Sequence, residues 1–379
     1  MASRRLPFFG RHQPSSHEPR WSIDVGRTLR TKTPVVFWAS DLGEDVTSDS
    51  VVGILLKLGS LLQTEDLSSL VTQQISAMPQ PEKRYPSVIL ATCPVPWTSR
   101  FEFDADLFKR ITTTLARDLS SHLYVFGTAG EGYAVTDRQF EAVVRAFHAA
   151  MPADSQPMVG IISLSLGTVI ERIELGHAAG FRDFQLSLPS WGALTDAEVD
   201  TFFMETCGRF PDCRFLHYNL MRAKRMLVGA DYARLAAAHR NLVAIKMGGE
   251  DRAAFVDILA KAPALQCFFT EFGYAAMRNH YECGLLSALS ACNHRKAHAY
   301  FAARGTALAA LQEEFRLVHR AIRAAIDPVA THMDGVYDKI YVKLQFPDFP
   351  LRLLPPYAFS DDGAVERFRR SLPVGWTNS

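Results

Sequence analysis

Short apolar runs alternate with longer amphipathic segments from Pro86 onward. The run at 87–91 precedes the segment 103–119, in which apolar residues recur every third or fourth position, as on one face of a helix. The same order then repeats along the chain. The strands it predicts are 87–91, 122–126, 157–162, 183–188, 214–218, 242–245, 265–269 and 285–289, and the helices between them are 103–119, one from 136, 168–179, one from 195, 230–239, 251–261 and 273–282.

Two of these helices open with a capping box, in which a Ser or Thr and a Glu or Gln three residues later cap the first turn together. They are Thr136 with Gln139, and Thr195 with Glu198. Eight strands that alternate with helices over roughly 200 residues match the size of a (β/α)₈ TIM barrel. A doubly wound open sheet has the same order of elements, and periodicity alone does not separate the two. We predict the closed barrel, an α/β fold, over residues 86–292.

Three further segments flank the predicted barrel. Residues 293–379 predict a C-terminal helical region. Residues 21–85 do not follow the alternation and are interpreted as an N-terminal extension of unknown role. Residues 1–20 are rich in Arg, Ser and His and lack the apolar core of a secretory signal, which predicts a disordered tail. The elements expected in these segments are a strand at 33–38 and helices at 51–62, 294–326 and 333–344.

The composition is that of an ordinary globular protein, with 48% apolar and 21% charged residues. Lys and Arg number 41 and Asp and Glu 40, so the net charge of +1 favours neither a nucleic acid nor a membrane as partner. No apolar run reaches the roughly 18 residues of a membrane span. Six cysteines without a C-x-x-C pair predict reduced thiols and a cytoplasmic location. Twelve histidines lack metal-site spacing, so we predict neither a metal nor another cofactor.

A glycine-rich turn, G-T-A-G-E-G from Gly127 to Gly132, lies between the second predicted strand and its helix. The order G-x-x-G-x-G is not the dinucleotide fingerprint, and no G-K-[ST] follows as in a P-loop. Glycines let a backbone approach a ligand closely, and successive N–H groups near the start of a helix suit a carboxylate. A tight turn without a ligand is the alternative. In a barrel, such turns lie on the face that carries active sites.

Two reactive side chains end neighbouring strands. Lys246 follows an apolar run, and burial inside a barrel lowers the pKa of an amine, which leaves more of the neutral form that attacks carbonyls. Tyr218 ends the preceding strand, and a phenol can carry a proton to and from a substrate. A lysine that reaches solvent and a packed tyrosine are the alternatives. In a closed barrel Trp191 and Glu271 reach the same rim, whereas His217 alternates with Tyr218 and faces the helices.

Four motifs resemble the dihydrodipicolinate synthase / N-acetylneuraminate lyase family of class I, Schiff-base-forming aldolases. Residues 127–131, G-T-A-G-E, are similar to the family's G-[ST]-T-G-E. Tyr218 and Asn219 resemble the first two residues of its Y-N-x-P. Residues 244–246, A-I-K, resemble the G-I-K that supplies the Schiff-base lysine, and 284–287, G-L-L-S, resemble the late G-x-I-[SG]. The four motifs occur in this order at the spacing of barrel strands.

The resemblance implies that Lys246 forms an imine with pyruvate or another 2-keto acid and that Tyr218 is the acid/base residue. The turn around Thr128 would hold the keto acid's carboxylate. The implied reaction is carbon–carbon cleavage, or condensation with an aldehyde, by a homodimer or homotetramer whose C-terminal helices pack beside the barrel. The predicted substrate-binding residues are Gly127, Thr128, Ala129, Trp191, Arg222, Glu271 and Leu286.

Several positions depart from the family's motifs. Ala129 replaces a hydroxyl residue, and Met221 replaces the Pro after Y-N. Ala223, next to Arg222, stands where the synthases have an arginine for the second substrate's carboxylate, and Trp191 stands where an aromatic pair is usual. These departures alter the proton relay but not the imine, and they predict an enzyme other than the lysine-pathway synthase. Two alternatives stay open: a dehydratase or hydratase-aldolase of the same family, and a catalytically retired barrel that binds a keto acid or a protein partner.

Overall fold

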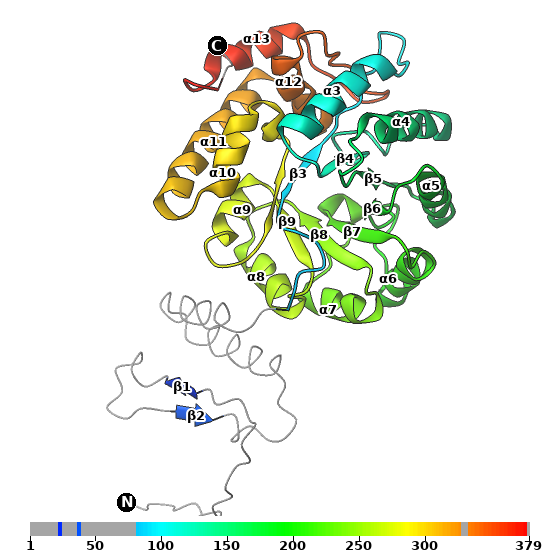
Figure 1. Cartoon of the computed structure of the whole chain (residues 1–379), viewed down its shortest axis with the longest axis vertical. Coiled ribbons are helices and arrows are strands. Elements are labelled where there is room, and N and C mark those ends of the chain that lie inside the picture. Colours follow the sequence, from blue (N-terminus) through cyan, green and yellow to red (C-terminus); the bar gives the residue numbers. More distant parts are fainter. Residues whose placement is uncertain (1–21, 25–35, 39–80, 327–332, 377–379) are drawn as a thin grey trace, which may run out of the picture. The chain divides into compact units, whose positions relative to one another are not determined.

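The computed structural model describes residues 22–24, 36–38, 81–326 and 333–376 (Figure 1). The chain divides into the units Met1–Ala77 and Met78–Ser379, each described by itself. In the first unit, β1 (Ser22–Asp24) pairs antiparallel with β2 (Val36–Trp38), which lies within the strand predicted at 33–38. The predicted tail and the predicted helix at 51–62 lie outside the described residues.

The barrel predicted from the alternation of strands and helices is closed (Figure 1). Its eight parallel strands are hydrogen-bonded in the order β10-β3-β4-β5-β6-β7-β8-β9. The last strand pairs with the first, with Leu285 opposite Ile89, and this closure excludes the open sheet. The strands are β3 (Ile89–Thr92), β4 (Leu123–Val125), β5 (Met158–Gly160), β6 (Asp183–Leu186), β7 (Arg214–Asn219), β8 (Leu242–Met247), β9 (Gln266–Phe269) and β10 (Gly284–Ser287).

Helices connect the strands and cover the outside of the barrel (Figure 1). The predicted capping boxes at Thr136 and Thr195 are both formed. The helix predicted at 273–282 begins at Glu271 and ends at Met277, after which the N–H groups of His280 and Tyr281 both bond to the Met277 carbonyl. The helices are α3 (Ala105–Asp118), α4 (Asp137–Ala150), α5 (Leu166–Ala178), α6 (Asp196–Phe203, continued by a π turn at Met204–Gly208), α7 (Gly229–Ala238), α8 (Arg252–Lys261) and α9 (Glu271–Met277).

Alternate strand residues fill the interior of the barrel, and the others pack against the helices. Ala244 belongs to the interior cluster and Ile245 to the outer one, so Lys246, two residues beyond Ala244, faces inward. The same alternation on β7 places Leu216 and Tyr218 on the interior side. The interior cluster consists of Tyr85, Leu90, Tyr124, Met158, Leu216, Val243, Ala244, Phe268 and Leu286.

The end of the predicted N-terminal extension packs against the amino-terminal ends of the strands. The Arg84 guanidinium donates hydrogen bonds to the carbonyls of Ala236, His239 and Leu242, at 2.9, 3.1 and 3.0 Å. Tyr85 is buried, and its hydroxyl lies 2.9 Å from a ring nitrogen of His122. Residues 84 and 85 therefore close the end of the barrel opposite the predicted active-site face.

The C-terminal region contains more helices than the pattern predicted. The helix expected at 294–326 is two, because the chain turns at Arg304 and Gly305, where the glycine has a φ of +53°. A last helix was missed by the pattern because most of its residues are polar. It is capped by Asp361, and Val365 and Phe368 are among its few buried residues. It packs on the longest helix of this region (Figure 1). The helices are α10 (His294–Ala302), α11 (Gly305–Ala325), α12 (Gly335–Gln345) and α13 (Asp362–Ser371).

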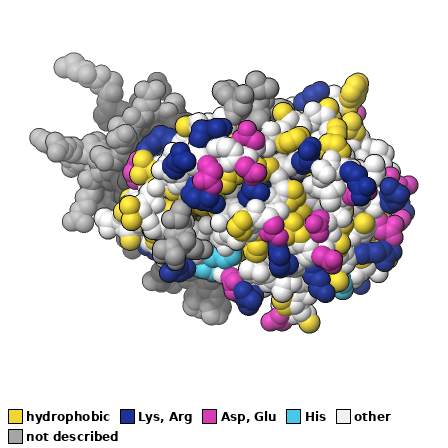
Figure 2. All heavy atoms as spheres, turned by 90° about the horizontal axis from the view of Figure 1, so that it is seen from above, with side chains coloured by type: hydrophobic (Ala, Val, Ile, Leu, Met, Phe, Trp, Pro, Cys, Tyr) yellow, Lys and Arg dark blue, Asp and Glu magenta, His cyan; other side chains and the backbone are white. Residues whose placement is uncertain are grey.

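The charge distribution on the surface and the state of the cysteine thiols agree with what the composition indicates. Basic and acidic side chains are interspersed over the face shown in Figure 2. All six cysteines have free thiols and are buried. Within the described part of the chain, no helix has the length and apolar character needed to cross a membrane.

Candidate active site

Lys246 is the chemical centre of the site. It lies on β8 and is only 2% exposed. Its Nζ donates to the Tyr124 hydroxyl and to the Gln185 Oε1, both at 3.0 Å, and lies 4.0 Å from the centroid of the Tyr218 ring. Burial lowers the pKa of this amine from 10.5 to about 7, against the opposing charge of nearby carboxylates. At neutral pH a large fraction of the amine is therefore a nucleophile.

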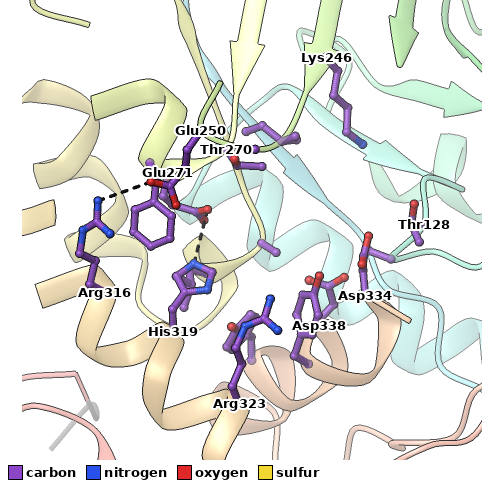
Figure 3. A pocket seen from close by; sticks show the side chains of 18 of the residues that line it. Thr128, Lys246, Glu250, Thr270, Glu271, Arg316, His319, Arg323, Asp334 and Asp338 are labelled. Atoms are coloured by element: carbon purple, nitrogen blue, oxygen red, sulfur yellow. Dashed lines mark ion pairs between the residues drawn. The ribbon is translucent and has the colours of Figure 1, made fainter. Parts of the chain in front are cut away.

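The amine opens into a cavity of about 530 Å³ between the barrel and the C-terminal helices. Figure 3 shows the Lys246 side chain pointing into it from β8. Leu286 from β10 and Glu271 from the start of α9 line the same cavity, as the sequence predicted for both. The cavity lies at the carboxyl ends of the strands, where barrel enzymes place their active sites.

Tyr218 stands beside Lys246 because the two residues are register partners on β7 and β8. Burial first, and then the charge of Asp334, raise the pKa of its phenol to about 12, while a hydrogen bond with Thr128 opposes them. The hydroxyl is therefore protonated at neutral pH and can donate. His217 precedes Tyr218 on β7, and its side chain faces the helices as predicted. Its Nδ1 lies 2.8 Å from the Tyr232 hydroxyl.

The glycine-rich turn lies against the amine. A Cβ on Gly127 would lie 2.6 Å from a ring carbon of Tyr124 and 3.3 Å from the Lys246 Nζ, so only glycine fits here. Thr128 and Ala129 follow it and line the cavity. The structure thus brings Gly127, Thr128 and Ala129 together with Lys246, as the sequence predicted.

Glu131, the last residue of the G-T-A-G-E motif, holds α12 over the barrel. Its carboxylate accepts from the Trp97 indole at 2.9 Å and from the Leu354 N–H at 2.6 Å, and it pairs with the Lys339 Nζ of α12 at 2.7 Å. The side chains of Glu131 and Lys339 are both 0% exposed. This buried cluster fixes α12 relative to the glycine-rich turn, so Glu131 has a positioning role.

One face of α12 contributes carboxyl groups to the cavity. Asp334, Tyr337, Asp338 and Tyr341 all line it, at the spacing of a single helical face. Figure 3 shows Asp334 and Asp338 side by side. Asp338 is 2% exposed, and burial followed by the charge of Asp334 raises the pKa of its carboxyl well above the usual range, with Lys246 opposing.

A face of α11 contributes basic groups to the other wall. Arg316 lies 3.7 Å from Glu250, and the His319 Nε2 lies 3.8 Å from Glu271 (dashed lines in Figure 3). Burial opposes ionisation of Glu271, but His319 and a 2.7 Å hydrogen bond from Ser287 outweigh it and lower the pKa of that carboxyl. The remaining basic residues of this wall are Arg320 and Arg323.

Two predicted binding residues lie outside the cavity lining. Trp191 is 84% exposed, and its backbone carbonyl accepts a hydrogen bond of 2.8 Å from the Lys224 Nζ. Arg222, in the 3-10 turn Met221–Ala223, pairs with Asp334 of the cavity wall at 3.4 Å and is not itself among the lining residues. The structure therefore does not place either residue beside Lys246.

Several residues of the site were missed from the sequence, among them Tyr124, Gln185 and Asp338. Tyr124 and Gln185 face inward on β4 and β6 by the same alternation that selects Lys246, so the strand pattern contained a signal for both. The glutamine is also a polar residue inside an apolar run. Asp338 has no comparable signal, because nothing in the pattern of α12 indicates which barrel residues it contacts.

One group of possible metal ligands is found among the described residues. His177, Asp212 and Cys213 offer ligand atoms within 4.8 Å of one another. None of them lines the cavity of Lys246. The carboxylate of Asp212 is already engaged by His177 at 2.6 Å and by Arg182 at 3.6 Å, which disfavours a cation there.

The chain is thus a (β/α)₈ barrel with a buried lysine of lowered pKa at the carboxyl ends of its strands. Neither models of protein families nor curated protein sequences match the chain. Solved structures do match. YagE, a prophage protein of the dihydrodipicolinic acid synthase family from E. coli K12 in complex with pyruvate, superimposes with a TM-score of 0.67 and 13% identity over 76% of this chain and 97% of its own.

Two further structures agree with this match. The dihydrodipicolinate synthase of Cyanidioschyzon merolae with lysine bound has a TM-score of 0.65 and 18% identity, over 76% of this chain and 98% of its own. The N-acetylneuraminate lyase of Mycoplasma synoviae has a TM-score of 0.64 and 16% identity, over 76% and 97%. The chain therefore has the fold of the dihydrodipicolinate synthase / N-acetylneuraminate lyase family, as its motifs predicted.

Proposed function

We propose that this chain is a class I lyase or aldolase that binds pyruvate or another small 2-keto acid as an imine on Lys246. The observation that carries the proposal is the buried amine with a pKa lowered to about 7, open to a cavity beside a protonated phenol. A fold alone does not define an activity, so the argument rests on this site. The similarity to the fold of the pyruvate complex of YagE supports the choice of keto acid.

The residues around Lys246 supply the steps of imine formation. The neutral amine attacks the C2 carbonyl, and the resulting carbinolamine loses its hydroxyl as water with a proton from the Tyr218 phenol. The keto acid's carboxylate is held by the Thr128 hydroxyl and the backbone after Gly127. The Gln185 Oε1 accepts a hydrogen bond from the amine and keeps the amine directed at the substrate. The imine then withdraws electrons from the neighbouring carbon, where a bond to an aldehyde carbon forms or breaks.

Chemical trapping tests the proposal. Borohydride reduction in the presence of pyruvate is expected to add a reduced keto acid to the peptide that contains Lys246, as measured by mass spectrometry. Lys339 is an internal control, because its amine is equally buried but paired with Glu131. An adduct on a different lysine, or none with a panel of small 2-keto acids, would contradict the proposal.

Replacement of Tyr218 by phenylalanine tests the proton donor. Turnover is expected to fall about 10²-fold or more, the usual scale for a lost general acid/base. The change removes one hydroxyl and little volume, so the thermal midpoint should hardly move. Activity within a few-fold of wild type would show that Tyr218 is a packing residue.

The charged residues of the cavity bear on the identity of the second substrate. Ala223 is buried and Arg222 pairs with Asp334, which supports a second substrate other than that of the lysine-pathway synthases. Positive charge instead comes from α11, across the cavity. We therefore keep the prediction of an enzyme other than that synthase. Product analysis separates an aldolase, which releases two carbon fragments, from a dehydratase that uses the same imine. The homo-oligomeric state and the cytoplasmic location remain predictions.

A further inference from the structure

Two polar atoms on α12 are buried at the cavity without a partner. The Asp338 Oδ1 and the Tyr341 hydroxyl have no hydrogen bond to any residue that the structure describes. Both residues line the cavity of Lys246, one helical turn apart. Buried polar atoms are nearly always satisfied in native proteins, so an unsatisfied pair in the lining of the cavity that holds Lys246 indicates a bound substrate as the missing partner.

The position of Asp338 is fixed by its neighbour in the chain. Lys339 makes the buried ion pair with Glu131 and also donates to the Arg352 carbonyl. These contacts hold α12 against the glycine-rich turn, and that turn lies against the Lys246 amine. The carboxyl of Asp338 is therefore held in place over the cavity, as a proton-transfer group must be.

Four other groups of the cavity are poorly suited to removing a proton from carbon. Lys246 is consumed by the imine. The phenols of Tyr124 and Tyr218 both have raised pKa values, so their basic forms are scarce at neutral pH. The carboxylate of Glu271 has a lowered pKa and is engaged by Ser287, which makes it a weak base.

Asp338 differs from these four groups. Burial raises its pKa, which makes its carboxylate a stronger base than an exposed one. Its charge and that of Lys246 interact, so a cationic iminium on Lys246 favours the ionised form of Asp338 at the moment when a base is needed.

We propose that Asp338 is the acid/base residue for the carbon next to the imine. The inference rests on the proposed imine at Lys246. The carboxylate takes a proton from that carbon, the C–H electron pair becomes the C=C bond of an enamine, and the iminium nitrogen becomes neutral. In the reverse direction the carboxyl returns the proton to the enamine carbon. No further co-reactant is needed.

Deuterium exchange tests the inference without knowledge of the second substrate. Wild-type protein with pyruvate in D₂O is expected to exchange the methyl protons, measured as the loss of their ¹H NMR signal. Asp338→Asn is expected to slow this exchange by about 10²-fold or more. The borohydride adduct on Lys246 should still form, because the amine is untouched. Asp348→Asn is the matched control, since that carboxylate is exposed and pairs with Arg110 away from the cavity.

The outcomes separate the inference from the proposed function. No adduct in wild type overturns the proposed function. An adduct with undiminished exchange in Asp338→Asn, or an adduct in wild type without exchange, overturns the role of Asp338 alone. Loss of exchange in His319→Asn but not in Asp338→Asn assigns the proton to the histidine and also overturns it. If Asp338→Asn loses its fold, Asp338→Ala with added formate is the second variant, and formate is expected to restore exchange to it.

Discussion

Replacing Lys246 by arginine or methionine is expected to abolish the pyruvate adduct and to lower deuterium exchange by on the order of 10⁴-fold or more, the scale seen when a covalent nucleophile is removed. The guanidinium stays protonated and methionine has no amine, so neither attacks a carbonyl. Lys261→Met is the control, because that lysine lies on the outside of the barrel and pairs with Asp257. Residual exchange within about tenfold of wild type would show that another amine carries the reaction.

The pH dependence of trapping tests the same residue. Burial lowers the pKa of Lys246 to about 7, so the neutral amine predominates above that pH and the ammonium below it. The rate of adduct formation is therefore expected to rise through about pH 7 and then level off. A lysine in contact with water would continue to gain reactivity toward its ordinary pKa of 10.5. A rise centred near the latter value would contradict the burial argument.

The barrel and the inward-facing residues were predictable because both follow from short-range patterns. A strand alternates its side chains, so the apolar run before Lys246 determined which way the lysine points. The capping residues Thr136 and Thr195 mark the starts of their helices through contacts within four residues. Such local rules do not depend on the rest of the fold. Tyr124 follows the same alternation and could have been predicted with them.

The other wall of the cavity could not be predicted, because it is made by long-range contacts. Asp338 reaches the site through long-range contacts of α12, such as the pair of Lys339 with Glu131, which lies 208 residues earlier in the chain than Lys339. Trp191 shows the converse. Its place after β6 predicted that it lies at the rim of the barrel, but the residue is exposed in a loop whose backbone is held by Lys224. Loop side chains are directed by such contacts and not by periodicity.

The contact between Glu131 and Lys339 therefore joins the two walls of the site. The glycine-rich turn presents Gly127 to the amine on one side of Glu131. On the other side, the ion pair with Lys339 sets the position of α12. A family-like motif at the barrel mouth thus also fixes a helix that carries a cavity-lining acid.

Replacing Lys339 by methionine is expected to destabilise the protein by about 3–5 kcal/mol, because it leaves the Glu131 carboxylate buried without its counter-ion. For a chain of this size we expect a fall in the thermal midpoint of roughly 5–10 °C, measured by circular dichroism. Lys261→Met removes a lysine from a partly exposed pair and should change stability by no more than about 1 kcal/mol. The double variant Lys339→Met/Glu131→Gln should recover part of the loss, since it leaves no unpaired charge. A single variant as stable as wild type, or a double variant no better than the single, would show that Trp97 and Leu354 satisfy Glu131 without the lysine.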